Sequence, residues 1–231
     1  SDHDLAFDEL FRRHLRNVYR LLDQPVPDEL FVSNISAGAP APAETEPTGL
    51  LSPVMDGEES SYFEWMGAGS LEVQQTIGAM HQAERSAAAL SQIRFGFDRE
   101  SLFVRLDGGR PVSELLGEGL AFSLVFLDPD RLRIILRSGD GHELSILVLE
   151  RLDQQADWAP RPVDGVRAVA GSILEIRVPL DVVGSREGGR PVSFFVAVHD
   201  ARGVELERHP SHRPIETTVP DDRFEALNWT A

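Results

Sequence analysis

The sequence predicts a mainly β protein, an antiparallel β-sandwich preceded by an N-terminal amphipathic helix and a Pro-rich linker. Roughly ten short runs of alternating apolar and polar residues follow one another, separated by Gly, Asp and Pro, a pattern typical of a sandwich. No helical pattern recurs between these runs, so a parallel sheet with crossover helices is not expected. At 231 residues the chain is long enough to bury a core of its own.

The helical pattern occupies the first part of the chain. Apolar residues recur there in steps of three and four, as on one face of a helix, at Phe7, Phe11, Leu15, Val18 and Leu22. Pro25 and Pro27 end this pattern, and "PDELF" at 27–31 can add one short turn. A lone amphipathic helix is marginal in water, so its stripe should pack on this chain or on a neighbouring domain. We assign residues 1–35 to this helical segment.

Two further zones complete the chain. Residues 36–49 are rich in Ala, Pro, Glu and Thr, which predicts an extended linker or a long surface crossing. Residues 50–231 make up the predicted sandwich domain. Within it, "IRFGFD" and "LFVRLD" joined by "RES" predict a hairpin over 93–107. Only residues 79–92 have the pattern of a helix or a loop.

Composition excludes several classes of partner. The formal net charge is −16, from 38 acidic and 22 basic residues, and every basic residue is Arg, so a nucleic-acid partner is not expected. The longest apolar runs, such as 120–127, are far shorter than the ~20 residues that span a bilayer, so no membrane partner is expected. The chain has no cysteine, which fits a reducing compartment, and we expect a cytoplasmic location.

Motifs for catalysis and cofactor binding are missing. The sequence has no phosphate-binding loop, dinucleotide fingerprint, zinc-protease motif or nucleophile elbow, and we assign no catalytic residue, although a carboxylate pair leaves no motif. His209 and His212 beside Glu207 could bind a metal, but the pattern, which includes Pro210, favours a solvated polar loop over a metal site. The Asp-rich turns at 128–130 and 138–141 offer calcium ligands, yet such turns usually serve as turn formers. No metal or cofactor is therefore expected.

The stretch "SSYFEWMGAG" at 60–69 gathers three aromatic residues in a chain that is 7% aromatic. On a strand, Phe63 and Trp65 would face one side and Tyr62 and Glu64 the other. Glu rarely buries unpaired, so we expect Phe63 and Trp65 in the core and Tyr62 and Glu64 near solvent. Exposed rings next to carboxylates suit sugar binding. A ring stacks on the apolar face of a pyranose, and the carboxylates accept hydrogen bonds from the hydroxyl groups of the sugar.

Two other tryptophans are candidate sugar platforms. Trp158 lies in the polar stretch "DQQADWAPRP", which offers no evident core for its ring. Trp229 lies close to the end of the sequence. Plain core packing is the alternative interpretation of the rings at 60–69. On the sugar-binding interpretation, the candidate residues are Tyr62, Glu64, Trp158 and Trp229.

An ordered series of segments resembles a known family. It comprises "FDELFRRHLRNVYRLLDQPVPDELF", the Pro-rich stretch, "PTGLLSPVMDGEESSYFEWMGAGS", "GAMHQA", "IRFGFDRESLFVRLD", "LEIRVPLDVVG" and "FFVAVHDARGVELERHP". This series is similar to the C-terminal portion of bacterial glycoside hydrolase family 57 proteins, which include α-amylases, amylopullulanases and branching enzymes. The resemblance implies a β-sandwich similar to DOMON-like domains and to family 9 carbohydrate-binding modules, after the tail of a helical region. The family's catalytic residues lie in an N-terminal barrel whose motifs are missing here.

The resemblance implies a non-catalytic accessory domain that binds α-glucan through its exposed aromatics. The alternative is a structural interaction module that packs on the parent catalytic domain and has no sugar site; its signature is a large exposed apolar patch. An independent enzyme on the sandwich is a third reading. Some DOMON-like relatives bind haem, and the candidate axial ligands, by residue type only, are Met55, Met66, Met80 and His81.

Overall fold

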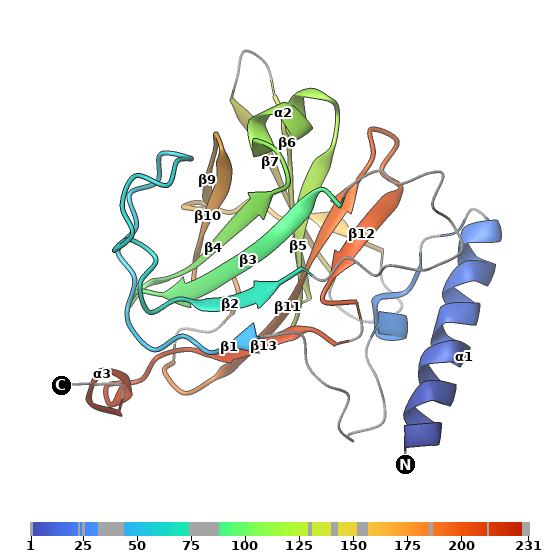
Figure 1. The fold of residues 1–231 in the computed structure, drawn as a ribbon, viewed down its shortest axis with the longest axis horizontal. Coiled ribbons are helices and arrows are strands. Elements are labelled where there is room, and N and C mark those ends of the chain that lie inside the picture. The colour runs from blue at the N-terminus through green and yellow to red at the C-terminus, as the bar shows by residue number, and fades with distance from the viewer. Residues whose placement is uncertain are drawn as a thin grey trace.

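Two antiparallel sheets packed face to face make up the protein, which confirms the predicted β-sandwich (Figure 1). The computed structural model describes residues 2–22, 24, 26–31, 44–73, 88–128, 131–139, 143–151, 157–184, 187–211 and 213–227.

Each sheet combines strands from distant parts of the chain. In order across the sheet, sheet A contains β1 (Glu44–Thr45), β2 (Gly69–Glu72), β3 (Leu90–Phe97), β4 (Ser101–Gly108), β10 (Ile173–Pro179) and β9 (Arg167–Ala170). Sheet B contains β12 (Glu205–His209), β11 (Pro191–His199), β5 (Ala121–Asp128), β6 (Leu132–Ser138), β7 (Leu144–Glu150) and β8 (Ala159–Pro160), and β13 (Ile215–Thr218) also pairs with β11. The predicted hairpin over 93–107 is confirmed as β3 and β4.

The core lies between the sheets because alternate side chains of each strand point inward. Phe194 of β11 packs edge-to-face on Phe95 of β3, at 6.0 Å between ring centroids, and so joins the two sheets. Phe126 of β5 lies 5.6 Å from the same ring. The short helix α2 (Val112–Gly117) adds Leu115 and Leu116 to this core cluster.

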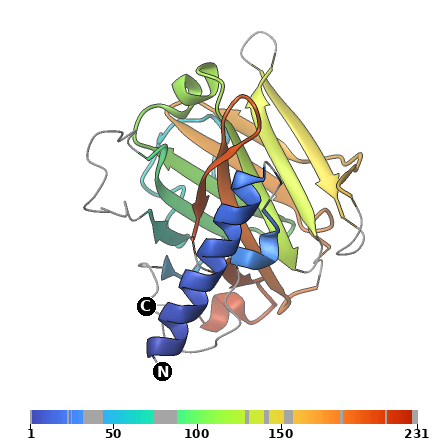
Figure 2. The ribbon, with the colours of Figure 1, turned by 90° about the vertical axis from the view of Figure 1, so that its right-hand side faces the viewer.

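Helix α1 (Asp2–Leu21) confirms the predicted helix, yet it docks through its polar side. Arg12 and Arg16 are buried, whereas the predicted apolar stripe is largely exposed. The Arg16 guanidinium lies 4.9 Å from the centroid of the Phe31 ring, and Arg12 donates to the Leu30 carbonyl at 3.5 Å. Figure 2 shows α1 in front of sheet B. No helix in the described part of the chain has the length and apolarity to cross a bilayer.

The 3-10 helix η1 (Asp28–Phe31) confirms the short turn predicted at "PDELF" and covers the outer face of sheet B. The Phe31 ring packs edge-to-face on Phe195 of β11, with 6.2 Å between centroids, and also contacts Val125. The buried Arg208 guanidinium lies 3.9 Å from the centroid of the same Phe31 ring and forms a 3.0 Å ion pair with Asp28. The end of the helical segment thus belongs to the packed structure.

Several sequence predictions differ from the structure. Residues 90–92, expected in a helix or a loop, belong to strand β3, and residues 79–87 lie outside the described residues. Residues 44–45, at the end of the predicted linker, form the edge strand β1. Residues 62–67 form turns, so the prediction of a strand there is wrong, and the strand begins only at Gly69. Trp65 is buried as predicted, but Phe63 is exposed, because successive residues in a turn do not alternate between two faces. The last helix, α3 (Phe224–Leu227), was not predicted.

Candidate functional site

Strands β4 and β10 carry charged side chains on the outer face of sheet A. Leu102, Val104 and Leu106 of β4 face the core, so Arg105 lies on the opposite face. Glu175 of β10 is directly opposite Arg105 in the strand register. Neither charged residue is open to solvent, because the 46–68 segment crosses this face of the sheet.

Glu175 fastens that segment to the sheet. One carboxylate oxygen accepts hydrogen bonds from the backbone N–H groups of Asp56 and Gly57, at 3.0 and 2.9 Å, and the other accepts from Trp65 Nε1 at 3.2 Å. Burial raises the pKa of Glu175, and the three hydrogen bonds oppose this rise. Gly57 has a φ of 79°, and a Cβ there would lie 2.7 Å from the Gly171 nitrogen, so this close approach requires glycine.

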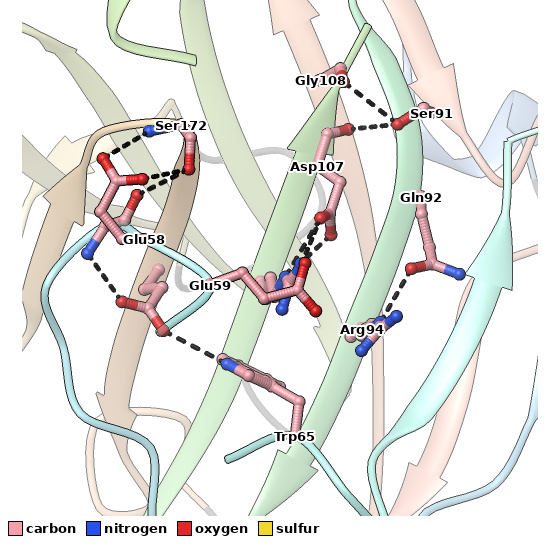
Figure 3. Close-up of polar contacts among 12 residues, drawn as sticks. Glu58, Glu59, Trp65, Ser91, Gln92, Arg94, Asp107, Gly108 and Ser172 are labelled. Carbon is pink, nitrogen blue, oxygen red and sulfur yellow. Dashed lines mark hydrogen bonds and ion pairs between the residues drawn. The ribbon is translucent and has the colours of Figure 1, made fainter. Parts of the chain in front are cut away.

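Arg105 forms the second anchor. Its guanidinium binds Asp107 through two atoms, with Nη2–Oδ1 at 2.6 Å and Nε–Oδ2 at 3.0 Å, and it reaches Glu59 of the crossing segment at 3.1 Å. Burial lowers the Arg105 pKa, but the two carboxylates outweigh it, so the pKa is raised and the cation is held charged. Ser172 gives a third anchor, since its hydroxyl donates to Glu58 at 2.6 Å (Figure 3).

Held in this way, the turns at residues 62–67 present two aromatic rings to solvent. Tyr62 is 77% exposed and Phe63 is 71% exposed, and their rings stack edge-to-face with centroids 5.8 Å apart. Glu64 beside them is half-buried: its Oε1 accepts from the Ser60 hydroxyl at 3.3 Å. Its Oε2 is shielded from solvent and, among the described residues, receives no hydrogen bond. We call Tyr62, Phe63 and Glu64 the loop platform.

A polar strip continues from these anchors across the outer face of sheet A. Arg94 of β3 donates to the Gln92 amide oxygen at 2.8 Å, and Gln92 in turn donates to Glu72 of β2. Asp107 remains half-buried while it binds Arg105. Figure 3 shows Gln92, Arg94 and Asp107 on neighbouring strands of this face. Such planar amide, guanidinium and carboxylate groups can hydrogen-bond to vicinal hydroxyls.

The structure does not bring the predicted sugar-binding residues together. Trp158 is half-buried, and the Arg133 guanidinium lies 4.7 Å from the centroid of its ring. Arg133 projects from β6 on the outer face of sheet B, so Trp158 and Tyr62 lie on opposite sides of the sandwich. Trp229 lies outside the described residues.

A Ser–His pair on sheet B does not form an accessible nucleophile. Ser123 Oγ lies 2.9 Å from His199 Nε2, the contact that a base makes with a nucleophile. However, Ser123 is fully buried, so a substrate cannot reach its hydroxyl. Burial lowers the pKa of His199, with the Arg133 and Arg208 cations acting in the same direction.

Metal and haem candidates find no support among the described residues. No group of three His, Asp or Glu side chains there is arranged to hold an ion. His209 Nε2 is 3.0 Å from Glu207, which also accepts from the Ala89 backbone N–H at 2.6 Å. Met66 is exposed and Met55 is half-buried beside the Trp65 cluster. His212, Met80, His81 and parts of both Asp-rich turns lie outside the described residues.

A cavity of about 320 Å³ has none of the loop-platform residues in its lining. Arg99, Asp221, Asp222 and Phe224 line it. Its size falls at the lower end of the range for small-molecule sites. Its lining mixes one ring with charged groups of both signs.

Sequence reasoning missed Glu175 and Arg105, the two residues that organise the loop platform. A signal was present, because each is a charged residue inside a short apolar run, in "SILEIRVPL" and "LFVRLD". Comparisons with protein-family models, with curated proteins and with solved structures found no match. The fold and the side-chain geometry therefore carry the functional argument.

Proposed function

We propose that this chain is a non-catalytic accessory domain of an α-amylase-like glycoside hydrolase, and that it binds α-glucan at the loop platform. The supporting observation is that Tyr62 and Phe63 are exposed on a segment that buried polar anchors fix to sheet A. A fixed ring pair binds with a smaller loss of conformational entropy than a mobile one. A cytoplasmic location for the parent enzyme belongs to this proposal.

The chemistry of the platform suits a neutral sugar. Each ring can stack on a glucose face, worth about 1 kcal/mol, so the isolated domain should bind with millimolar to micromolar affinity. Glu64 Oε2, which lacks a hydrogen bond within the described chain, can accept one from a sugar hydroxyl after a small side-chain rotation. A net charge of −16 favours an uncharged glycan over an anionic one.

The residue set differs from the one expected from sequence. Phe63 joins Tyr62 and Glu64, because it lies exposed beside them. Trp158 cannot contact the same sugar chain segment as Tyr62, since the sandwich separates the two rings. Trp229 remains a prediction from the sequence.

Calorimetry with maltooligosaccharides and retention on insoluble starch test the proposal. We expect Tyr62→Ala and Phe63→Ala each to weaken binding about fivefold, the loss of one stacking contact. Leu206→Ala is the matched control, since Leu206 is an exposed apolar residue on β12, in the other sheet. If millimolar sugar gives no heat and the domain is not retained on starch, the proposal is wrong. Binding that survives both ring substitutions would place the sugar site elsewhere.

The alternative function, a structural interaction module, is favoured by a different surface. Helix α1 exposes several large apolar side chains, including Phe7 and Leu21. In this alternative the exposed surface of α1 packs on the parent catalytic domain, and the chain has no sugar site.

A further inference from the structure

Helix α1 presents to solvent an apolar stripe that its own sandwich leaves uncovered. The stripe residues are 36–86% exposed, and they are Phe7, Leu10, Phe11, Val18, Leu21 and Leu22. The opposite side of the helix is fixed by Arg12 and Arg16. The helix is thus held in place with its apolar side outward. Contiguous exposed apolar patches of this kind mark interaction sites.

The stripe has the spacing of a coiled-coil seam. Phe7, Phe11, His14, Val18 and Leu21 follow one another in steps of four, three, four and three, and all five are exposed. Steps of this kind repeat every seven residues and keep one side of a helix against a partner helix. His14, a polar residue, occupies the middle position of the seam.

The seam is close to symmetric about its centre, with a difference of one residue at its inner positions. Around position 14, Phe7 and Leu21 are equidistant at seven residues, and Phe11 and Val18 lie three and four residues away. In an antiparallel pair of identical helices, Phe7 would therefore face Leu21 of the second copy, and each His14 would face its own equivalent. A two-fold interface requires such self-complementarity, in which one patch serves both subunits.

Charge along α1 also favours an antiparallel second copy. In the sequence of the helix, the charged residues of the first half are all acidic and those of the second half are all arginines. Arg12 and Arg16 are buried against this chain's own fold, and Arg12 forms a 2.8 Å ion pair with Asp8, so the positive charge that faces a partner comes from Arg13 and Arg20. Antiparallel pairing places the acidic half of one helix along the basic half of the other, whereas parallel pairing places like charges together. Arg13 and Arg20 are exposed at the edge of the stripe, where they can reach a partner.

We propose that α1 is a self-association surface, on which a second copy of this chain binds through an antiparallel α1–α1 pair across a two-fold axis near His14. The interface is independent of glycan binding. The anchoring of α1 by η1 makes it preorganised, since the helix need not fold on association.

The absence of cysteine from the sequence allows a direct test of the helix orientation. Phe7→Cys and Leu21→Cys variants are made separately in the full chain and oxidised alone or mixed. The antiparallel pair predicts a disulfide-linked dimer mainly in the mixture, between the two different variants. A parallel pair would instead link each variant to itself, which would overturn the proposal.

Sedimentation velocity of the unmodified chain measures the association itself. We expect a concentration-dependent shift to twice the monomer mass, and a dissociation constant raised about tenfold or more by Phe11→Ser, because each substitution acts twice at a two-fold interface. His14→Leu should tighten the dimer, an effect that misfolding cannot imitate. Phe63→Ser, which changes another exposed phenylalanine far from α1 in the sequence, is the control and should leave the mass unchanged. A monomer at all concentrations up to several hundred micromolar would overturn the proposal.

Discussion

Replacing Glu175 by alanine should detach the 46–68 segment from sheet A while leaving the two sheets intact. The Glu175 carboxylate is fully buried and accepts three hydrogen bonds, from the N–H groups of Asp56 and Gly57 and from the Trp65 indole. Without it, three donors would be left under the segment with no acceptor. The residue lies on the outer face of β10, so the core between the sheets loses no side chain.

The size of the effect can be bounded from these contacts. A buried donor without a partner costs about 1–3 kcal/mol, so three such donors would cost about 3–9 kcal/mol if the segment stayed in place. Two effects reduce this figure: the variant no longer buries a carboxylate, and the segment can lift off and let its donors bind water. We therefore expect a loss of about 2–4 kcal/mol in the free energy of unfolding.

The matched variant is Glu175→Gln, which keeps an acceptor for Asp56 and Gly57 but turns an amide NH₂ towards the Trp65 N–H. Its free energy of unfolding should be lower by about 1 kcal/mol, the contribution of one hydrogen bond. Urea unfolding gives the stabilities, and hydrogen exchange at the amides of Asp56 and Gly57 reports the segment directly. Unchanged exchange protection at these two amides in Glu175→Ala would refute the reasoning, whatever the stability.

Three further predictions concern the rest of the fold. Phe194→Ala, which removes the ring that joins the sheets, should lower the free energy of unfolding by about 3–5 kcal/mol in urea. Phe31→Ala removes the ring under Arg208 and should increase protease cleavage within α1 without changing the core. Burial raises the pKa of Glu207, but hydrogen bonds, chiefly from His209, outweigh it and lower that pKa from 4.5. Its stabilisation is therefore present above pH 4.5 and lost as the pH falls through the lowered value, so Glu207→Gln should flatten the acid branch of a melting-temperature profile.

Much of the fold could be predicted because the local patterns agree with the tertiary structure. The alternation in "IRFGFD" and "LFVRLD" predicts a hairpin, and β3 and β4 form it. The N-terminal periodicity likewise predicts α1. The periodicity could not show which side of the helix packs, because the apolar stripe and the polar side recur with the same helical period. The contact depends on Phe31, whose ring receives the Arg16 guanidinium.

The candidate site was less predictable, since it depends on contacts between distant residues. The run at 60–69 has aromatic residues typical of a strand, but Glu175, more than a hundred residues away, binds the Trp65 indole and the preceding backbone. Those hydrogen bonds favour turns over an extended chain. Phe63 consequently points outward, opposite to the expectation from alternation. Trp158 and Tyr62 are far apart because they lie next to different sheets. Local sequence patterns predict strands, but they do not show which sheet each strand joins.

Both proposed binding surfaces share one structural cause. The segments that cover the outer faces of the sandwich are fastened by polar groups, Arg12 and Arg16 on sheet B and the partners of Glu175 on sheet A. Because these groups occupy the inner side of each segment, the apolar stripe of α1 and the rings of Tyr62 and Phe63 are directed outward. Hydrophobic burial alone would turn each segment the other way. Buried polar contacts thus fix both segments with their exposed apolar side chains accessible to a partner. A preorganised binding surface requires this arrangement.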